Sequence, residues 1–248
     1  MDRRPGGKVE RMIILQWVIG IYVGAAVLPA LLLFWFVYKQ DRYEKEPWPL
    51  LRKLLLFGIL AALIAIVLEK LGTYLISGSV SEDSPYYVIV FAFLVVALAE
   101  ECAKYFLMKA VTWRNPNFNF RFDGIMYAVT ISLGFAAFEN LLYVIGYGLS
   151  VAPLRAILSI PGHLSFAVLM GFFYGRARLA KNKGMHTESE LLQIAGVASS
   201  VLLHGFYDTC ALTNSWLSTV IFVIFVVVLY VSVFFLIRRE SRRDRPLW

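Results

Sequence analysis

Long runs of apolar residues dominate the chain and are separated by short polar loops. A helix that crosses a bilayer needs about 20 predominantly apolar residues. Seven runs reach this length, with boundaries accurate to a few residues: residues 12–38, 54–76, 86–110, 124–146, 152–177, 191–213 and 216–237. The pattern therefore predicts an all-α integral membrane protein, a polytopic bundle of about seven transmembrane helices.

The fifth run is the least regular, because Pro161 and Gly162 interrupt it. We expect a short interfacial stretch there, followed by a helix that starts near Pro161. Two pairs of small residues predict close helix packing: Gly20 with Gly24, and Gly171 with Gly175. The sequence has no internal repeat, low-complexity tract or soluble domain. We therefore expect residues 1–248 to form a single transmembrane domain.

Lysine and arginine are distributed unevenly among the loops. Four segments are rich in them: residues 39–53, 109–121, 176–183 and 238–245. Loops 77–85 and 214–215 have none, and the turn at 147–155 has only Arg155. Because basic loops stay in the cytoplasm, the C-terminus is predicted to be cytoplasmic and the N-terminus to lie outside. The basic residues before position 12 conflict with this orientation, but four segments agree with it.

The composition supports lipid as the main partner of the protein surface. Hydrophobic residues make up 59% of the chain and charged residues 17%, whereas soluble domains are nearer half apolar and a quarter charged. The formal net charge of +7 arises from residues in the short loops and at the two ends. This distribution argues against binding of nucleic acid and for a multi-pass protein of the cell membrane.

Ionisable groups in the bilayer core are costly, so each is a candidate functional residue. Four successive runs contain them: Glu100 and Glu101, then Glu139, then His163, then His204 and Asp208. At about 1.5 Å of rise per residue, Glu100 lies roughly 15 Å from the cytoplasmic end of its helix. Glu139 and the two histidines lie roughly 20–25 Å deep by the same measure. Their similar depth predicts one shared site in a polar intramembrane cavity.

The residue types in this site suit metal-dependent hydrolysis. Histidine nitrogens and carboxylate oxygens bind zinc in tetrahedral geometry. A remaining carboxylate can act as general base on a zinc-bound water, which is chemistry that hydrolyses amide bonds. Because residues four apart share a helix face, His204 and Asp208 point the same way, as do Glu100 and Lys104.

Purely structural readings exist for several of these residues taken alone, although none of them explains Glu100. Glu101 and Lys104 can neutralise each other as a buried ion pair. His163 can donate to a carbonyl that Pro161 leaves free, and His204 with Asp208 can be a structural pair. The shared depth favours a site over these separate explanations. Glu69 and Lys70, by contrast, are expected to pair or to reach outward.

With these residues identified, the chain resembles the PrsW family of intramembrane proteases. That family belongs to a superfamily with the CAAX prenyl endopeptidases and bacteriocin-processing membrane proteases. The resemblance begins at the DRYEKEPW segment and extends to the end of the sixth run. Four elements in order carry it: Glu100-Glu101 with Lys104 (EExxK), Phe135 to Glu139-Asn140 (FxxxEN), Pro161 with His163, and His204 with Asp208 (HxxxD).

The resemblance implies a metal-dependent peptidase of the bacterial plasma membrane, with its catalytic helices at about 86–213. The family role implies that the substrate is a single-span membrane protein such as an anti-sigma factor. The wider superfamily has a histidine four residues after the phenylalanine, where this chain has Glu139. The implied metal ligands, for zinc in the first place, are therefore Glu139, His163 and His204. Asp208 is a fourth ligand or orients a histidine.

The remaining residues receive catalytic roles from the same resemblance. Glu100 is favoured as the base that activates water, because Lys104 on its face can tune it; Glu101 is the alternative. Asn140 is expected to polarise the scissile carbonyl or to stabilise the oxyanion.

Other functions remain open at this point. A zinc-dependent lipid amidase can use a similar site. A proton-coupled transporter also uses buried Glu, His and Asp, although a relay is expected to step across the membrane and transporters often contain repeats. A catalytically inactive scaffold is a further alternative.

Overall fold

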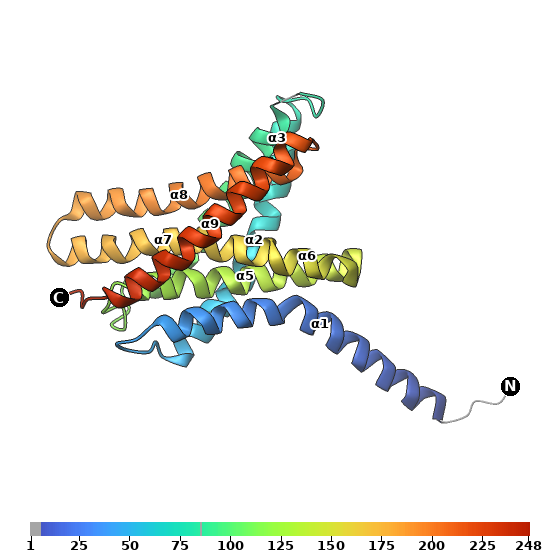
Figure 1. Ribbon diagram of the computed structural model, residues 1–248, viewed down its shortest axis with the longest axis horizontal. Coiled ribbons are helices and arrows are strands. Elements are labelled where there is room, and N and C mark those ends of the chain that lie inside the picture. The colour runs from blue at the N-terminus through green and yellow to red at the C-terminus, as the bar shows by residue number, and fades with distance from the viewer. Residues whose placement is uncertain (1–5, 85) are drawn as a thin grey trace.

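The computed structural model describes residues 6–84 and 86–248, which are helical throughout apart from short connections (Figure 1). The elements in chain order are α1 (Gly6–Gln40), α2 (Trp48–Ser77), α3 (Tyr87–Val90), η1 (Phe91–Ala97), α4 (Leu98–Thr112), α5 (Asp123–Tyr147), η2 (Leu149–Val151), α6 (Ala152–Ile157), α7 (Ser159–Asn182), α8 (His186–Leu212) and α9 (Trp216–Arg242). Element η1 is a π-helical segment and η2 a 3₁₀ turn. The described part of the chain contains no β-strand. The predicted all-α fold is confirmed.

Within residues 6–84 and 86–248, seven long helical stretches correspond to the seven predicted runs. Five helices of this described part are long and apolar enough to cross a membrane: Met12–Gln40, Trp48–Ser77, Asp123–Tyr147, Leu149–Asn182 and Trp216–Arg242. The other two are the continuous rod from α3 to α4 and helix α8. These two carry several charged residues in the part of the bundle where the site forms, which lowers their hydropathy.

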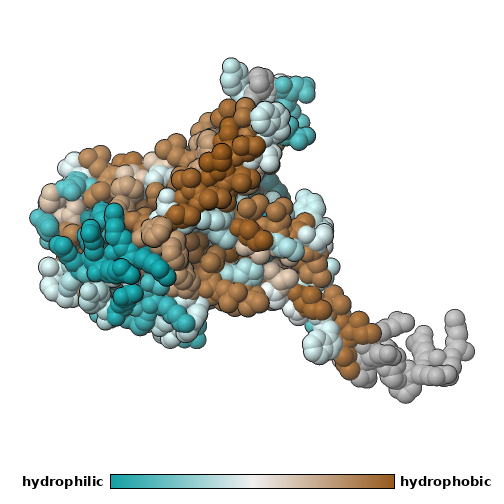
Figure 2. All heavy atoms as spheres, in the orientation of Figure 1, coloured by the Kyte–Doolittle hydropathy of each residue, from teal (hydrophilic) through white to brown (hydrophobic). Residues whose placement is uncertain are grey.

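Helices α5 and α7 form the centre of the bundle. In the most apolar stretch of α5, 61% of the residues are buried inside the protein, against 17% in α1 and 22% in α9. Helices α1 and α2 pack against α5, and α8 packs against α7. Helix α9 crosses α7 and α8 diagonally in Figure 1. Figure 2 shows apolar side chains along the outer faces of α1 and α9, as expected for surfaces in contact with lipid.

Glycines allow the central helices to approach each other closely. A Cβ on Gly124 of α5 would lie 2.6 Å from the Gly171 carbonyl oxygen and 2.6 Å from the Gly175 nitrogen, both in α7. The predicted packing role of Gly171 and Gly175 is therefore confirmed. The prediction for Gly20 and Gly24 was wrong, because a Cβ at either position would have no atom of the described residues within 4 Å.

The segments predicted to be cytoplasmic gather at one end of the bundle (Figure 1). The Asn119 side chain donates to Glu44 across two of these loops (2.9 Å). Leu247 of the C-terminal tail donates its backbone N–H to the Asn119 carbonyl (2.8 Å) and accepts from the Asn182 side chain at its own carbonyl (2.9 Å). The tail is thus folded back onto the loops, and Leu247 is buried.

The irregular fifth run divides as expected. Residues 149–157 form the short elements η2 and α6, and α7 begins at Ser159, two residues before Pro161. Pro161 therefore lies in the first turn of α7, where the missing N–H has no intrahelical partner to lose. As a result, Arg155 lies in α6 and His163 lies in α7.

Candidate functional site

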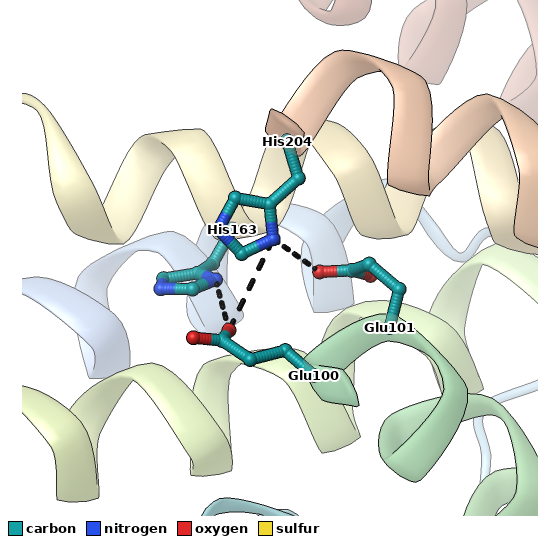
Figure 3. A group of neighbouring side chains, drawn as sticks. All are labelled: Glu100, Glu101, His163 and His204. Atoms are coloured by element: carbon teal, nitrogen blue, oxygen red, sulfur yellow. Dashed lines mark hydrogen bonds and ion pairs between the residues drawn. The ribbon is translucent and has the colours of Figure 1, made fainter. Parts of the chain in front are cut away.

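Three helices bring four buried side chains together in the interior of the bundle (Figure 3). Glu100 and Glu101 come from α4, His163 from α7 and His204 from α8. Each offers one nitrogen or oxygen atom, and these four atoms all lie within 4.8 Å of one another. The convergence expected from depth along the helices is therefore present.

The π-helical segment η1 directly precedes the two glutamates. A π-helical turn holds an extra residue, and such turns are frequent at functional sites. Phe93 of η1 lies against Gly205 of α8, where a Cβ would come within 2.6 Å of the phenyl ring. Gly205 directly follows His204, so η1 packs against α8 next to this histidine.

Lys104 lies at the centre of the cluster. Its ammonium group donates to Glu100 Oε2 (3.1 Å), to Glu101 Oε1 (2.7 Å) and to His163 Nδ1 (3.3 Å). The ion pair between Glu101 and Lys104 is therefore real, but it is part of a larger group. One fixed positive charge balances part of the negative charge of two adjacent carboxylates.

Both histidines direct Nδ1 inward and Nε2 toward an outer carboxylate. His204 Nδ1 lies 3.0 Å from Glu101 Oε1, and His163 Nδ1 lies 3.9 Å from Glu100 Oε2. On the other side of the rings, His163 Nε2 lies 3.1 Å from Glu139 Oε2, and His204 Nε2 lies 3.4 Å from Asp208 Oδ2. Carboxylates in such outer positions fix the orientation of metal-binding imidazoles.

Glu139 and Asn140 have contacts that differ from the roles expected of them. Glu139 is not among the four clustered donors; its Oε2 accepts from Arg155 Nη2 (2.8 Å) as well as facing His163. The Asn140 amide donates to the carbonyl of Ala26 in α1 (2.8 Å) and accepts from Arg155 Nε (2.9 Å). Its polar atoms are thus engaged in packing α5 against α1 and α6.

A cavity of about 540 Å³ opens beside the cluster. Its polar lining comprises Glu69, Glu100, Glu139, Tyr143, Arg155, Ser159, His163, His204, Tyr207, Asp208 and Thr219. Glu69 of α2 was expected to face away from the site; the signal that would have identified it is its position as a carboxylate within an apolar run. A larger groove of about 770 Å³ between α4 and α8 is mainly apolar and contains none of the four clustered residues.

The donor set fits a metal ion. Two imidazoles and two carboxylates are nitrogen and oxygen ligands of the kind that zinc takes. All four residues are buried, and Glu101 Oε2 is buried without a hydrogen-bond partner among the residues that the structure describes. An unpartnered buried carboxylate oxygen is costly in a protein interior, and a bound cation would satisfy it.

Comparison with known proteins gives consistent results. The family described as "PrsW family intramembrane metalloprotease" matches residues 46–237. Protease PrsW of Geobacillus kaustophilus is 33% identical over 186 residues, which is 75% of this chain and 77% of the relative. Protease PrsW of Oceanobacillus iheyensis is 32% identical over 221 residues, 88% of this chain and 95% of the relative.

A third relative, protease PrsW of Clostridioides difficile, is 30% identical over 209 residues, 83% of this chain and 85% of the relative. No solved structure matches the chain. The family match covers the helices that carry all four clustered residues. A multi-pass helical bundle, a buried Glu/His cluster and these relatives agree, and the chain belongs to the PrsW family of intramembrane metalloproteases.

Proposed function

We propose that this membrane peptidase hydrolyses its substrate with a water molecule activated at a zinc ion held by His163, His204 and Glu101. The observation that carries the proposal is the convergence of donor atoms from three helices within 4.8 Å. A bound divalent metal supplies Lewis acidity, which makes water acidic enough to lose a proton near neutral pH. Membership of a peptidase family favours this chemistry over the transporter and lipid amidase alternatives.

The two adjacent glutamates have different surroundings, and these suggest different roles. Glu100 lines the cavity, whereas Glu101 does not and is 1% exposed. A general base must reach the water and the substrate, so we assign this role to Glu100. Glu101, with its unpartnered Oε2 and its contact to His204, is the better ligand. In this assignment Glu101 replaces Glu139 among the ligands.

The proton balance of the reaction follows from these positions. Glu100 takes a proton from water as the water oxygen attacks the scissile carbonyl carbon. The same carboxyl group then returns the proton to the leaving amine nitrogen as the C–N bond breaks. Lys104 keeps its contacts with both glutamates and limits the repulsion between their charges.

The substrate and its environment are proposed from the family and the fold. The cavity lies among helices that cross the membrane, so a membrane-tethered, single-span protein is the substrate class that reaches it. An anti-sigma factor is the candidate that the family role suggests. We further propose a bacterial plasma membrane location, with the C-terminus and the basic loops in the cytoplasm.

The test measures zinc content and peptide cleavage on the full chain purified in detergent. About one zinc per wild-type chain is expected by mass spectrometry, with loss of zinc in His204→Ala and Glu101→Gln. Glu100→Gln is expected to keep zinc and to cleave a single-span reporter substrate about 10² to 10⁴ times more slowly. His186→Ala is the matched control, because His186 is exposed and is the first residue of α8, about five helical turns before His204.

Two results would contradict the proposal. One is a wild-type chain that cleaves the reporter at full rate in the presence of a strong chelator and holds no zinc. The other is a Glu100→Gln variant with wild-type turnover. Loss of zinc from Glu100→Gln but not from Glu101→Gln would reverse the two assignments.

A further inference from the structure

Arg155 is the only basic residue in the turn at 147–155, and its side chain is partly buried. It belongs to the six-residue helix α6 and is one of the residues that line the cavity. Its side chain is 15% exposed. An arginine that served only membrane topology would extend its charge toward water or lipid headgroups. Arg155 instead directs its charge toward the site.

The guanidinium group of Arg155 joins three elements. Its Nη2 donates to Glu139 Oε2 (2.8 Å) and to Ser159 Oγ at the start of α7 (3.0 Å). Its Nε donates to Asn140 Oδ1 (2.9 Å), and its planar group lies 3.7 Å from the ring centroid of Tyr143. These contacts use the fork of donors and the flat face that distinguish arginine from lysine.

The Glu139 oxygen that Arg155 contacts is also the one that faces His163. Glu139 Oε2 lies 3.1 Å from His163 Nε2. On the other side of the ring, His163 Nδ1 faces the Lys104 ammonium group at 3.3 Å. Lys104 can only donate, so this nitrogen must accept, and the proton of a neutral ring must lie on Nε2. The ring is thereby fixed with the Nδ1 lone pair toward the cluster.

We propose that Arg155 is a positioning residue, which holds Glu139 as the acceptor for His163 Nε2–H and so, together with Lys104 on the other side of the ring, fixes the tautomer and orientation in which Nδ1 faces Glu100 and Glu101. This inference rests on the proposed function, because that orientation matters for metal binding and hydrolysis. Arg155 acts through Glu139, since its hydrogen-bond partners in the site are Glu139, Asn140 and Ser159 rather than the clustered donors.

The geometry distinguishes this role from a plain ion pair. An ion pair needs only a positive charge near Glu139, which lysine also supplies. The simultaneous contacts of Nε with Asn140 and of Nη2 with Glu139 require the arginine fork. Arg155→Lys is therefore expected to restore the charge but only part of the positioning.

The first measurement is nitrogen NMR of the full chain in detergent, labelled with ¹⁵N-histidine and free of metal. The three histidines are resolved by single substitution, and the two ring nitrogens report the tautomer. We expect His163 of the wild type to hold its proton on Nε2, Arg155→Ala to give a mixture of tautomers, and Arg155→Lys to be intermediate. Arg42→Ala is the matched control, because Arg42 is an exposed arginine in a loop.

The second measurement is zinc affinity by competition with a chelating dye. Loss of a partner that orients a metal-binding histidine typically weakens metal binding about 10- to 100-fold. We expect that range for Arg155→Ala and for Glu139→Gln. The double variant is expected to be no weaker than either single one, because both changes interrupt the same chain of contacts.

The outcomes separate this inference from the proposed function. If the wild type binds no zinc, the proposed function fails, while the tautomer measurement still decides the role of Arg155. A wild-type tautomer and spectrum in Arg155→Ala would overturn the inference even if zinc binds. If Arg155→Ala does not fold, Arg155→Lys decides, and a wild-type His163 spectrum in that variant overturns the inference.

Discussion

The contact between α5 and α7 positions His163, so a change in their separation tests the connection between packing and the site. Gly171 of α7 lies against α5. A Cβ at Gly171 would be 2.5 Å from Ile125 Cα and closer still to the Gly124 carbonyl oxygen. An ordinary contact begins at 3.4 Å, so the shortfall is about 0.9 Å. Both neighbours are backbone atoms, which cannot rotate away.

Gly171→Ala is therefore expected to push α5 and α7 apart by roughly 1 Å and to destabilise the protein by about 1–3 kcal/mol. Gly171 is eight residues from His163, about 12 Å along the helix axis. The displacement would lengthen the 3.1 Å contact between His163 and Glu139. Because a misplacement of 1 Å in an active site can reduce the rate about 10²-fold, we expect turnover to fall by up to that factor.

The assay combines thermal unfolding in detergent with turnover of the reporter substrate. Gly20→Ala is the matched control, since a Cβ there has no atom within 4 Å and alanine is the better helix former. The control is expected to keep wild-type turnover and equal or higher thermal stability. A Gly171→Ala variant as stable and active as Gly20→Ala would refute the reasoning, because it would mean that the helices do not approach as closely as the structure shows.

Two further predictions concern the end of the bundle where the basic loops gather. Burial raises the pKa of Glu46 to about 8 and that of Asp41 to about 6. The folded chain thus binds a proton at each of these two carboxyl groups more tightly than the unfolded chain does. The resulting contribution to the free energy of unfolding is fully present below about pH 4 and is lost as the pH rises through 6 to 8. The melting temperature in a pH series should fall over this range. In Glu46→Gln the fall near pH 8 should be smaller, and an unchanged dependence of melting temperature on pH in that variant would contradict the raised pKa of Glu46. Asp244 Oδ1 accepts from the backbone N–H of Phe122 at the start of α5 (2.9 Å). Asp244→Ala should therefore lower stability by about 1–2 kcal/mol, and Asp244→Asn, which keeps an accepting oxygen, should lose less in the same thermal assay.

Several features of the site were predictable from the sequence because a bilayer makes them conspicuous. Lipid cannot solvate an ionisable group, so Glu100, His163 and His204 stand out against their apolar neighbours. The rise per residue of a helix is nearly constant, so depth along the axis follows from counting. Successive helices cross the membrane in opposite directions, so every second loop lies on the same side, and the basic loops are therefore grouped at one end of the bundle. These regularities determined the helical class, the number of long helices and the convergence of the polar residues.

The tertiary structure decided which atoms meet, because rotation about a helix axis is not fixed by counting. The π-helical segment before Glu100 adds a residue to a turn, and one residue corresponds to about 100° of rotation. The apolar run from Tyr87 to Leu98 contains no residue pattern that predicts a π-helical segment. The same segment places Phe93 against Gly205, on a helix more than 100 residues away in the chain.

The difference between depth along a helix and rotation about its axis also explains the positions of Glu139 and Asn140. Glu139 lies at the depth expected of a ligand, but Arg155 holds it on the outer side of His163, and Glu101 takes its place among the clustered donors. Asn140 follows Glu139 in sequence yet faces α1. The sequence by itself predicted that these groups lie at a similar depth along their helices. Packing alone decided their partners, since each partner comes from a different helix whose rotation and tilt depend on all the others.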